Sequence, residues 1–390
     1  MADAPVYLDG FSTLPLAPEA REAMLSAWDQ PGNAGSANGA GERAARIIAD
    51  ARADVAELIG AVPSEIIFTS GATEANNLAI AGVVAATAGQ SPQRNRVIVS
   101  AVEHKAILEP AAALESQGFE VVAAPVDVHG RLDLTRFAAL LDDRVLLVSV
   151  MMVNNETGVV QPVAEAAILA HAVGAYIHSD AAQAAGKITI DVTVLDVDYL
   201  SLSAHKCYGP MGIGALYVAA GMPSPAPLMR GGGQQSGIRP GTEPVALIAG
   251  FGAVARGAMD RLAADEASGA ARAARLLEGL AKRQVRFTRI TGDHAVLPGS
   301  ASIALDGIDG DSLCTMIARE VSLSTGSACT NGQIRISHVL EAMGLSDSMA
   351  RSVVRIFCDR TLSDDDIDRA VDVIVAAIRR SRLATGEVRQ

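Results

Sequence analysis

The sequence predicts an α/β protein in which helices cover both faces of a mostly parallel sheet, followed by a smaller α+β unit. From residue 65 onward, short β-branched runs alternate with Ala-rich helical segments, the pattern of strand–helix–strand units. After about Thr288 this regular alternation stops, and short strands and helices follow without it. At 390 residues the chain is long enough for two domains with ample cores.

The elements of the large sheet can be placed in chain order. Apolar residues of 43–59 recur at helical spacing and Gly60 ends the run, which predicts a helix. Seven strands are predicted from the apolar runs at residues 65–69, 96–99, 120–123, 145–150, 175–178, 199–202 and 214–218. Because ligands bind at the carboxyl ends of strands in such sheets, we expect the functional residues in the loops that follow these runs.

The second half of the chain is predicted to begin with two long helices that lead into the smaller unit, at residues 244–264 and 267–282. The smaller unit is expected to contain strands at 301–305 and 353–357 and helices at 312–320, 334–343 and 363–379. We therefore expect a large domain of residues 14–260 and a small domain of residues 1–13 and 261–390.

Composition narrows the class of protein. With 49% hydrophobic and 19% charged residues the chain does not have the composition of a disordered protein. A net charge of -12 argues against nucleic acid or an anionic membrane as the main partner. No apolar run is long enough to span a bilayer, and the N-terminus lacks a secretory signal pattern, so we expect a cytoplasmic protein. Four cysteines without C-x-x-C spacing predict neither a disulfide framework nor a metal site.

Lys206 directly follows a predicted strand, beside Ser203 and His205 and before a glycine turn. A lysine at the carboxyl end of a strand can form a Schiff base with an aldehyde cofactor when its pKa is tuned. The alternative is an ordinary surface lysine at a strand end.

Two other strand ends carry chemistry that matches such a cofactor. After residues 65–69, a glycine turn opens a helix whose N–H groups, with the Ser70 and Thr73 hydroxyls, can hold a phosphate. The alternative there is an ordinary capped helix. Asp180 ends an apolar strand, and burial of its carboxylate is costly unless it meets a cation such as a protonated pyridine nitrogen. Alternatively, Asp180 caps the following helix. Together, Lys206, the glycine turn and Asp180 predict that the protein binds pyridoxal 5'-phosphate (PLP).

The sequence also resembles the cysteine desulfurases of the class V aminotransferase group, in particular the iron-sulfur and nitrogen-fixation type. The resemblance runs from about Tyr7 to Arg379. It is carried by Ser70-Gly-Ala-Thr-Glu-Ala-Asn-Asn, Glu103-His-Lys, Asn154-Asn-Glu-Thr-Gly, His205-Lys with Tyr208-Gly-Pro, Arg239-Pro-Gly-Thr and Ser324-Thr-Gly-Ser-Ala-Cys-Thr. It implies a fold-type I PLP-dependent transferase that acts as a homodimer.

The resemblance also implies roles for individual residues. Lys206 would bind the cofactor covalently and move protons, and His104 would stack on the ring and assist as a catalytic acid or base. Asp180 would pair with the ring nitrogen, and Gln183 would bond the phenolic oxygen. The phosphate would be held by Ala72, Thr73, Ser203 and His205, with Thr242 reaching it from the partner subunit. Asn155, beside the cofactor, and Arg355 would bind the substrate carboxylate.

Cys329 is expected to be the nucleophile. It lies in a run of small polar residues, which predicts an exposed loop rather than the buried site that most cysteines occupy. A thiolate is needed for attack on sulfur. Cys207, Cys314 and Cys358 are expected to be structural.

The resemblance therefore implies conversion of L-cysteine to L-alanine with a persulfide on Cys329. The sulfur would pass to an acceptor or scaffold protein for sulfur-containing cofactor or iron-sulfur cluster assembly. The alternatives are a selenocysteine lyase, another class V lyase or aminotransferase, or a cofactor-bound paralogue with altered substrate. Two departures from the family pattern, Phe357 and Asp359, lie near Arg355. Asp359 would either compete with substrate for Arg355 or Arg360, or lie solvated at the strand end.

Overall fold

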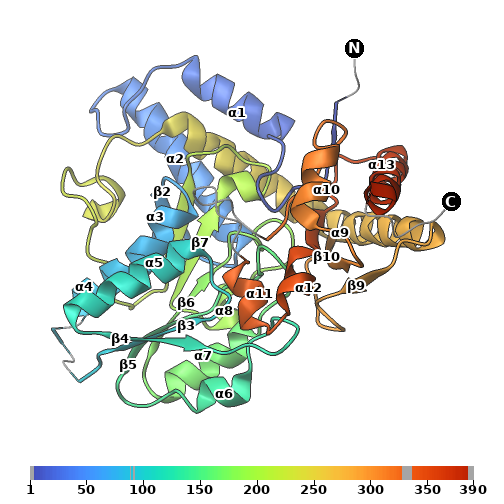
Figure 1. Ribbon diagram of the computed structural model, residues 1–390. Coiled ribbons are helices and arrows are strands. Elements are labelled where there is room, and N and C mark those ends of the chain that lie inside the picture. The colour runs from blue at the N-terminus through green and yellow to red at the C-terminus, as the bar shows by residue number, and fades with distance from the viewer. Residues whose placement is uncertain (1–3, 88, 91–92, 327–335, 385–390) are drawn as a thin grey trace.

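A computed structural model describes residues 4–87, 89–90, 93–326 and 336–384 (Figure 1). Its centre is a seven-stranded sheet with the order β2-β8-β7-β6-β5-β3-β4. The strands are β2 Ile66–Thr69, β3 Arg96–Ser100, β4 Glu120–Ala124, β5 Val145–Ser149, β6 Tyr176–Asp180, β7 Tyr199–Ser203 and β8 Gly214–Val218. Only β8 runs antiparallel to its neighbours β2 and β7, so the predicted mostly parallel sheet is confirmed.

Four strands, β3, β4, β6 and β7, extend further than the sequence predicted, and the last two bear on the site. Asp180 pairs with Ser201, and Ser203 pairs with Gly214, so Asp180 and Ser203 are the last residues of β6 and β7. The apolar runs end earlier, but backbone ladder bonds do not depend on side-chain polarity. Both polar side chains are therefore fixed by the sheet itself rather than by a loop.

Helices cover both faces of the sheet (Figure 1). One face carries α3 Ala72–Asn77, α4 Val83–Thr87 and α5 Lys105–Ala113, and the other carries α2 Gly39–Leu58, α7 Val163–Ala172 and the first part of α9 Val245–Lys282. Alternation along β3 shows why both faces are apolar. Val97 and Val99 pack in the cluster that includes Ile107 of α5, whereas Ile98 packs in the large cluster on the opposite face.

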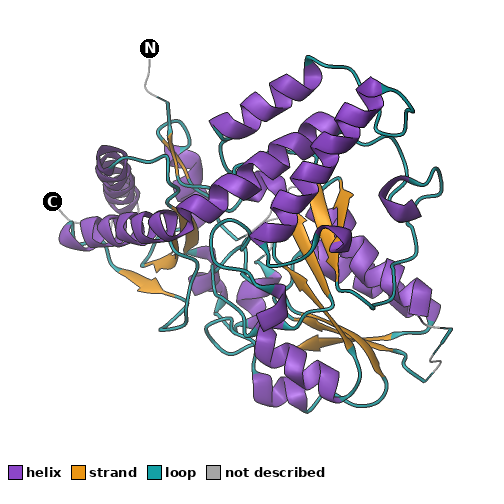
Figure 2. Cartoon of the chain, turned by 180° about the vertical axis from the view of Figure 1, so that it is seen from behind, coloured by secondary structure: helices purple, strands orange, loops and turns teal. Residues whose placement is uncertain are grey.

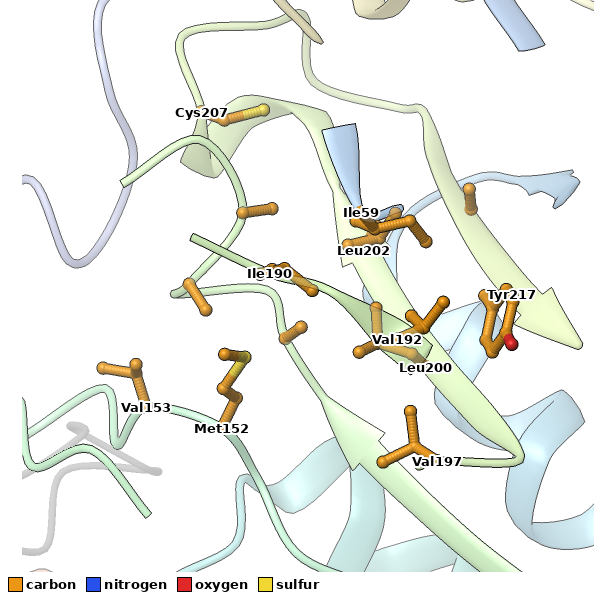
Figure 3. Close-up of a cluster of buried hydrophobic side chains, with 14 of the residues drawn as sticks. Ile59, Met152, Val153, Ile190, Val192, Val197, Leu200, Leu202, Cys207 and Tyr217 are labelled. Atoms are coloured by element: carbon orange, nitrogen blue, oxygen red, sulfur yellow. The ribbon is translucent and has the colours of Figure 1, made fainter. Parts of the chain in front are cut away.

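The large cluster of buried apolar side chains packs against the strands that end at the site, β6 and β7. Leu200 and Leu202 of β7, Tyr217 of β8 and Ile59 at the end of α2 lie together in it, all buried (Figure 3). Cys207 belongs to the same cluster. Truncation of one such leucine to alanine costs about 2–5 kcal/mol, because the cavity left behind collapses only partly. The residues at the ends of β6 and β7 are therefore supported by a tightly packed core.

The helical region after residue 244 is one helix, not two. α9 runs without a break over 38 residues, and the long helix can be followed across the molecule in Figure 2. The prediction of a break at residues 265–266 was wrong because Asp265 and Glu266 interrupt the apolar pattern without stopping helix geometry, as Gly or Pro would. Asp265 instead pairs with Arg360 at 3.1 Å. α9 packs against α1 Pro18–Trp28 and α2, and also against α13 Asp364–Ala384.

The C-terminal part holds a three-stranded antiparallel sheet of order β12-β10-β9, with β9 Phe287–Arg289, β10 Ser300–Leu305 and β12 Val353–Phe357. A second small sheet joins β1 Val6–Tyr7 in parallel to β11 Val321–Ser322. Besides α13, the helices of this C-terminal part are α10 Gly310–Ile317, α11 His338–Ala342 and α12 Asp347–Arg351. Two short helices connect strands of the large sheet: α6 Leu134–Ala138 lies between β4 and β5, and α8 Val192–Leu195 lies between β6 and β7.

The bounds in this part differ from the predicted ones. α10 begins two residues and ends three residues before its predicted bounds, and α13 extends beyond residue 379. The predicted start of a helix at residue 334 lies outside the described residues, while β9 and α12 were not predicted because each is too short to show a period. The division at residue 260 falls inside α9 and remains a prediction. Within the described ranges, no helix is both long and apolar enough to cross a membrane.

Candidate active site

A cleft of about 600 Å³ opens at the carboxyl ends of β6 and β7 and is closed on one side by β12. Eleven of the residues predicted for the site line it: Ser70, Ala72, Thr73, His104, Asn155, Asp180, Gln183, Ser203, His205, Lys206 and Arg355. Thr242 is exposed and does not line the cleft. Cys329 lies outside the described residues.

Lys206 lies in a short 3-10 turn, Ala204–Lys206, that follows β7 directly. Its Nζ donates to the backbone carbonyls of Phe11 and Ser12, the latter at 2.7 Å. Burial and the nearby positive charge of Arg355 lower its pKa to about 8. More of this amine is neutral near pH 7 than of a solvated lysine, and the neutral amine is the nucleophile toward an aldehyde. The surface-lysine alternative is therefore wrong.

Asp180 is buried at the end of β6 and accepts two hydrogen bonds. Asn76 Nδ2 donates to its Oδ2 at 2.7 Å, and Ala182 N donates to Oδ1 at 2.9 Å. The second bond shows that Asp180 also caps a turn after β6, although no helix follows directly as the alternative interpretation expected. Neither donor is charged, and the ion pairs of the described residues do not include Asp180, so this carboxylate suits a bound cation.

Asn76 was missed from the sequence. It is completely buried on α3, and its side-chain Oδ1 has no hydrogen-bond partner among the described residues. A polar residue on the inward face of a helix, one turn after a phosphate-type glycine turn, was the available signal.

The turn between β2 and α3 leaves backbone N–H groups facing the cleft. Gly71 is the N-cap of α3, and no side chain caps it. Glu74 instead accepts from Ser70 N at 2.6 Å and pairs with Arg239 at 3.0 Å. The alternative of a Ser70 or Thr73 side-chain cap is therefore wrong. Ser70 N and Gly71 N donate to Glu74 and Thr69, so the N–H groups of Ala72 and Thr73 are the ones that remain available to an anion.

The glycine at the start of β8 allows this turn to lie close to the sheet. A Cβ on Gly214 would come within 2.7 Å of Gly71 Cα, so any side chain there would push the turn away. On the other side of the cleft, His205 Nδ1 lies 3.1 Å from Thr13 Oγ1, and burial lowers the His205 pKa to about 4. A neutral imidazole and free N–H groups can hold a phosphate by hydrogen bonds.

His104 forms the N-cap of α5. Its Nδ1 accepts from Ala106 N at 3.1 Å, and burial lowers its pKa, so the proton of the neutral ring resides on Nε2. This bond fixes the ring against the wall of the cleft, as a stacking role requires.

Arg355 of β12 brings a guanidinium to the side of the cleft facing Lys206. Its Nη1 donates to Asn155 O at 3.2 Å, and its Nη2 contacts Ser12 Oγ at 2.7 Å and Asp9 Oδ1 at 3.3 Å. Nε is buried and has no partner among the described residues. Nη1 has a second N–H beyond the one given to Asn155, so the guanidinium retains a donor for an anion. Asp9 and Ser12 were not predicted, because they reach Arg355 only through the fold.

Asp359 does not compete for either arginine. Its Oδ1 accepts from Thr361 N at 2.6 Å and from Thr361 Oγ1 at 2.5 Å, and in the described residues it has no ion pair with Arg355 or Arg360. It is also 2% exposed, which excludes the solvated alternative. Both expectations for Asp359 were wrong, because the chain turns after β12 and buries its carboxylate in the protein.

The three described cysteines agree with the structural interpretation. Cys207 and Cys358 are buried and Cys314 is half-buried. Burial raises the pKa of each thiol to about 12, so little thiolate is present near pH 7. Among the described residues, no group of three or more His, Cys, Asp or Glu could hold a metal ion.

Comparison with known proteins places this site in a family. Residues 6–369 match the family described as Aminotransferase class-V. The chain belongs to this family. The fold-type I and PLP predictions are thereby confirmed, and the buried Asp180 carboxylate, the free N–H groups at α3 and the low-pKa Lys206 fit that cofactor.

Similar proteins cover nearly the whole chain. "Cysteine desulfurase" of Sinorhizobium fredii is 42% identical over 97% of both chains, and "Cysteine desulfurase IscS" of Rickettsia africae is 38% identical over 97% of this chain and 92% of its own length. Among solved structures, a "NifS-like protein" matches with a TM-score of 0.89 at 32% identity, covering 96% of this chain and 99% of its own. DndA from Streptomyces lividans matches at 36% identity with a TM-score of 0.75, over 92% of this chain and 99% of its own.

Proposed function

We propose that this chain is a PLP-dependent cysteine desulfurase, a sulfurtransferase that converts L-cysteine to L-alanine and forms a persulfide on Cys329. The observation that carries this proposal is the convergence of Lys206, Asp180, the α3 turn and Arg355 on one cleft. Named relatives at 38–42% identity along nearly the full chain support the same activity.

The binding step uses charges already held in place. Arg355 binds the substrate carboxylate through guanidinium N–H groups that its protein partners leave free, while Asp9 and Ser12 prevent the guanidinium from turning. Asn155 lies beside it, and its backbone carbonyl accepts from Nη1 at one edge of the guanidinium. This arrangement directs the amino group of cysteine toward Lys206 and its side chain away from Arg355.

Bound PLP supplies an electron sink for the substrate's α-carbon. In the bound cofactor, Asp180 would stabilise positive charge at the ring nitrogen, His104 would stack on the ring, and Gln183 would donate to the phenolic oxygen. Ala72, Thr73, Ser203 and His205 would hold the phosphate. The Lys206 amine, with its pKa near 8, takes the α-proton and returns a proton after the bond to sulfur has broken.

The sulfur step is a displacement by a thiolate. Cys329 Sγ attacks the substrate sulfur, a new S–S bond forms, and the substrate's C–S bond breaks with its electron pair going to carbon. That carbon gains a proton, and the product leaves as alanine. One thiol and one cysteine thus give one persulfide and one alanine, and no outside oxidant is needed.

The proposal also covers the oligomeric state, the cellular compartment and the sulfur acceptor. We expect a homodimer in which Thr242, exposed in one subunit, reaches the phosphate of the other. We expect a cytoplasmic enzyme that gives its sulfur to an acceptor or scaffold protein for cofactor or iron-sulfur cluster assembly.

The test is to mix purified protein with L-cysteine and measure alanine and protein-bound sulfur together. The proposal expects a yellow protein that releases alanine and gains one sulfur atom on Cys329. A yellow protein that transaminates cysteine, or releases alanine only from selenocysteine, would favour one of the alternative class V activities.

A further inference from the structure

Lys187 is a buried lysine behind the cleft that has no role in the chemistry described above. It is 6% exposed, and its Nζ donates to Gln183 Oε1 at 3.0 Å. The Phe357 ring lies 4.9 Å from the same Nζ. Within the described part of the chain, no carboxylate forms an ion pair with Lys187. Buried ionisable groups of this kind are concentrated at functional sites.

The Gln183 amide is held between two groups that settle its orientation. Its Nε2 donates to Phe11 O at 2.9 Å, while its Oε1 accepts from Lys187. A backbone carbonyl can only accept, and Lys187 is a donor, so a flipped amide would lose both bonds. Gln183 lines the cleft, and Nε2 has a second N–H beyond the one given to Phe11.

We propose that Lys187 is a positioning residue that fixes the Gln183 amide and strengthens the N–H that Gln183 presents to the phenolic oxygen of PLP. The inference rests on the proposed function only for the contact between Gln183 and the cofactor. A charged donor on the amide oxygen polarises the amide, and hydrogen bonds in such a chain strengthen one another.

The charges around Lys187 bear on how strongly it acts. Burial and the nearby Lys206 lower its pKa to about 7, while Cys207 and Asp359 oppose that shift. His205 is the other titratable neighbour, since Lys187 contributes to lowering its pKa. Lys187 has an N–H to donate in either state, but the polarisation of Gln183 is greater when the amine is charged.

The consequence can be seen in the spectrum of the resting protein. In the resting protein the nitrogen that joins Lys206 to the cofactor can gain or lose a proton. The phenolic oxygen of the cofactor carries more negative charge when that nitrogen has lost its proton. A stronger donor from Gln183 therefore favours the deprotonated form. Lys187→Met should raise the pH midpoint of the visible absorbance change by about one unit, a tenfold change in proton affinity.

The test is an absorbance titration of the holoprotein in a double-mutant cycle, with no substrate present. Lys187→Met should shift the midpoint upward in the wild-type background but cause no further shift in the Gln183→Leu background. Lys282→Met, an exposed lysine paired only with Glu278, is the matched control and should shift nothing. If Lys187→Met fails to fold, Lys187→Arg keeps the donor and should retain the wild-type midpoint more closely than Gln183→Leu does.

An unchanged midpoint in Lys187→Met would overturn the proposal. So would an equal shift in the Gln183→Leu background, because Lys187 would then act directly through its charge. Neither readout needs turnover, so failure here is distinct from failure of the desulfurase proposal, which alanine release tests.

Discussion

Asp9 and Arg355 form an ion pair of 3.3 Å that links the segment after β1 to the strand β12. The two residues are far apart in sequence and both are largely buried beside Lys206. The pair orients the guanidinium and leaves its buried Nε without a partner among the described residues.

Arg355→Lys should raise the KM for cysteine roughly 10-fold to 100-fold with PLP content unchanged. The reason is that a lysine cannot reproduce the two-point grip of a guanidinium, and each charge-assisted hydrogen bond contributes about 1.5–3 kcal/mol. Initial rates of alanine release against cysteine concentration measure this. Arg351→Lys, an exposed arginine on α12, is the matched control and should behave as wild type. A wild-type KM in Arg355→Lys would remove this residue from carboxylate binding.

Borohydride treatment should attach PLP to Lys206 alone. The chain has four lysines, at 105, 187, 206 and 282, and only Lys206 lines the cleft. Peptide mapping after reduction identifies the modified lysine. In Lys206→Ala the adduct should be absent, and a stable adduct on Lys187 in the wild-type protein would show that the attachment site has been assigned to the wrong lysine.

Asp180→Asn should lower the rate of alanine release by about 10²–10³ while PLP still binds. The amide keeps the shape of the carboxylate but loses the charge that stabilises the protonated ring nitrogen, an electrostatic contribution of this order. Asp198→Asn is a suitable control, because Asp198 is also a buried aspartate but does not line the cleft. Equal rates in Asp180→Asn and Asp198→Asn would exclude the ring-nitrogen role.

Glu156 makes the stability depend on pH. Burial raises the pKa of its carboxyl from 4.5 to about 7, even though Ser337 Oγ donates to it at 2.5 Å. Between these two values the folded protein binds more protons than the unfolded chain, so this group's contribution to stability falls as pH rises. Glu156→Gln removes that dependence.

The unfolding free energy of Glu156→Gln relative to wild type should therefore rise by about 2.5 kcal/mol between about pH 5 and about pH 8. Urea unfolding at the two pH values measures the difference. Glu165→Gln, an exposed glutamate on α7, should show no such change. A constant difference for Glu156→Gln would mean that its carboxyl titrates normally in the folded protein.

The fold was largely predictable because its signals are local. Most strands of the large sheet are short apolar runs; Asp180 ends one of them, and Lys206 and Thr73 lie within four residues of the ends of two others. α9 was divided wrongly because Asp265 and Glu266 were interpreted as a break, whereas Asp265 pairs with Arg360 far along the chain.

The parts of the site that could not be predicted are those that only packing creates. Asp9 and Ser12 meet Arg355 because the N-terminal segment lies beside β12. Lys187 supports Gln183 from within a turn whose burial is not visible in its own sequence. Asp359 looked like a rival for Arg355, but the turn that brings Thr361 to its carboxylate removes it from the cleft.

The most direct test of the central claim is mass spectrometry of peptides after the protein has turned over L-cysteine, with alanine measured in the same sample. The account predicts one added sulfur atom on Cys329, none on Cys207, Cys314 or Cys358, and almost no alanine from Cys329→Ser, although that variant still binds PLP and cysteine. Wild-type alanine release from Cys329→Ser, or sulfur found on another cysteine, would contradict it.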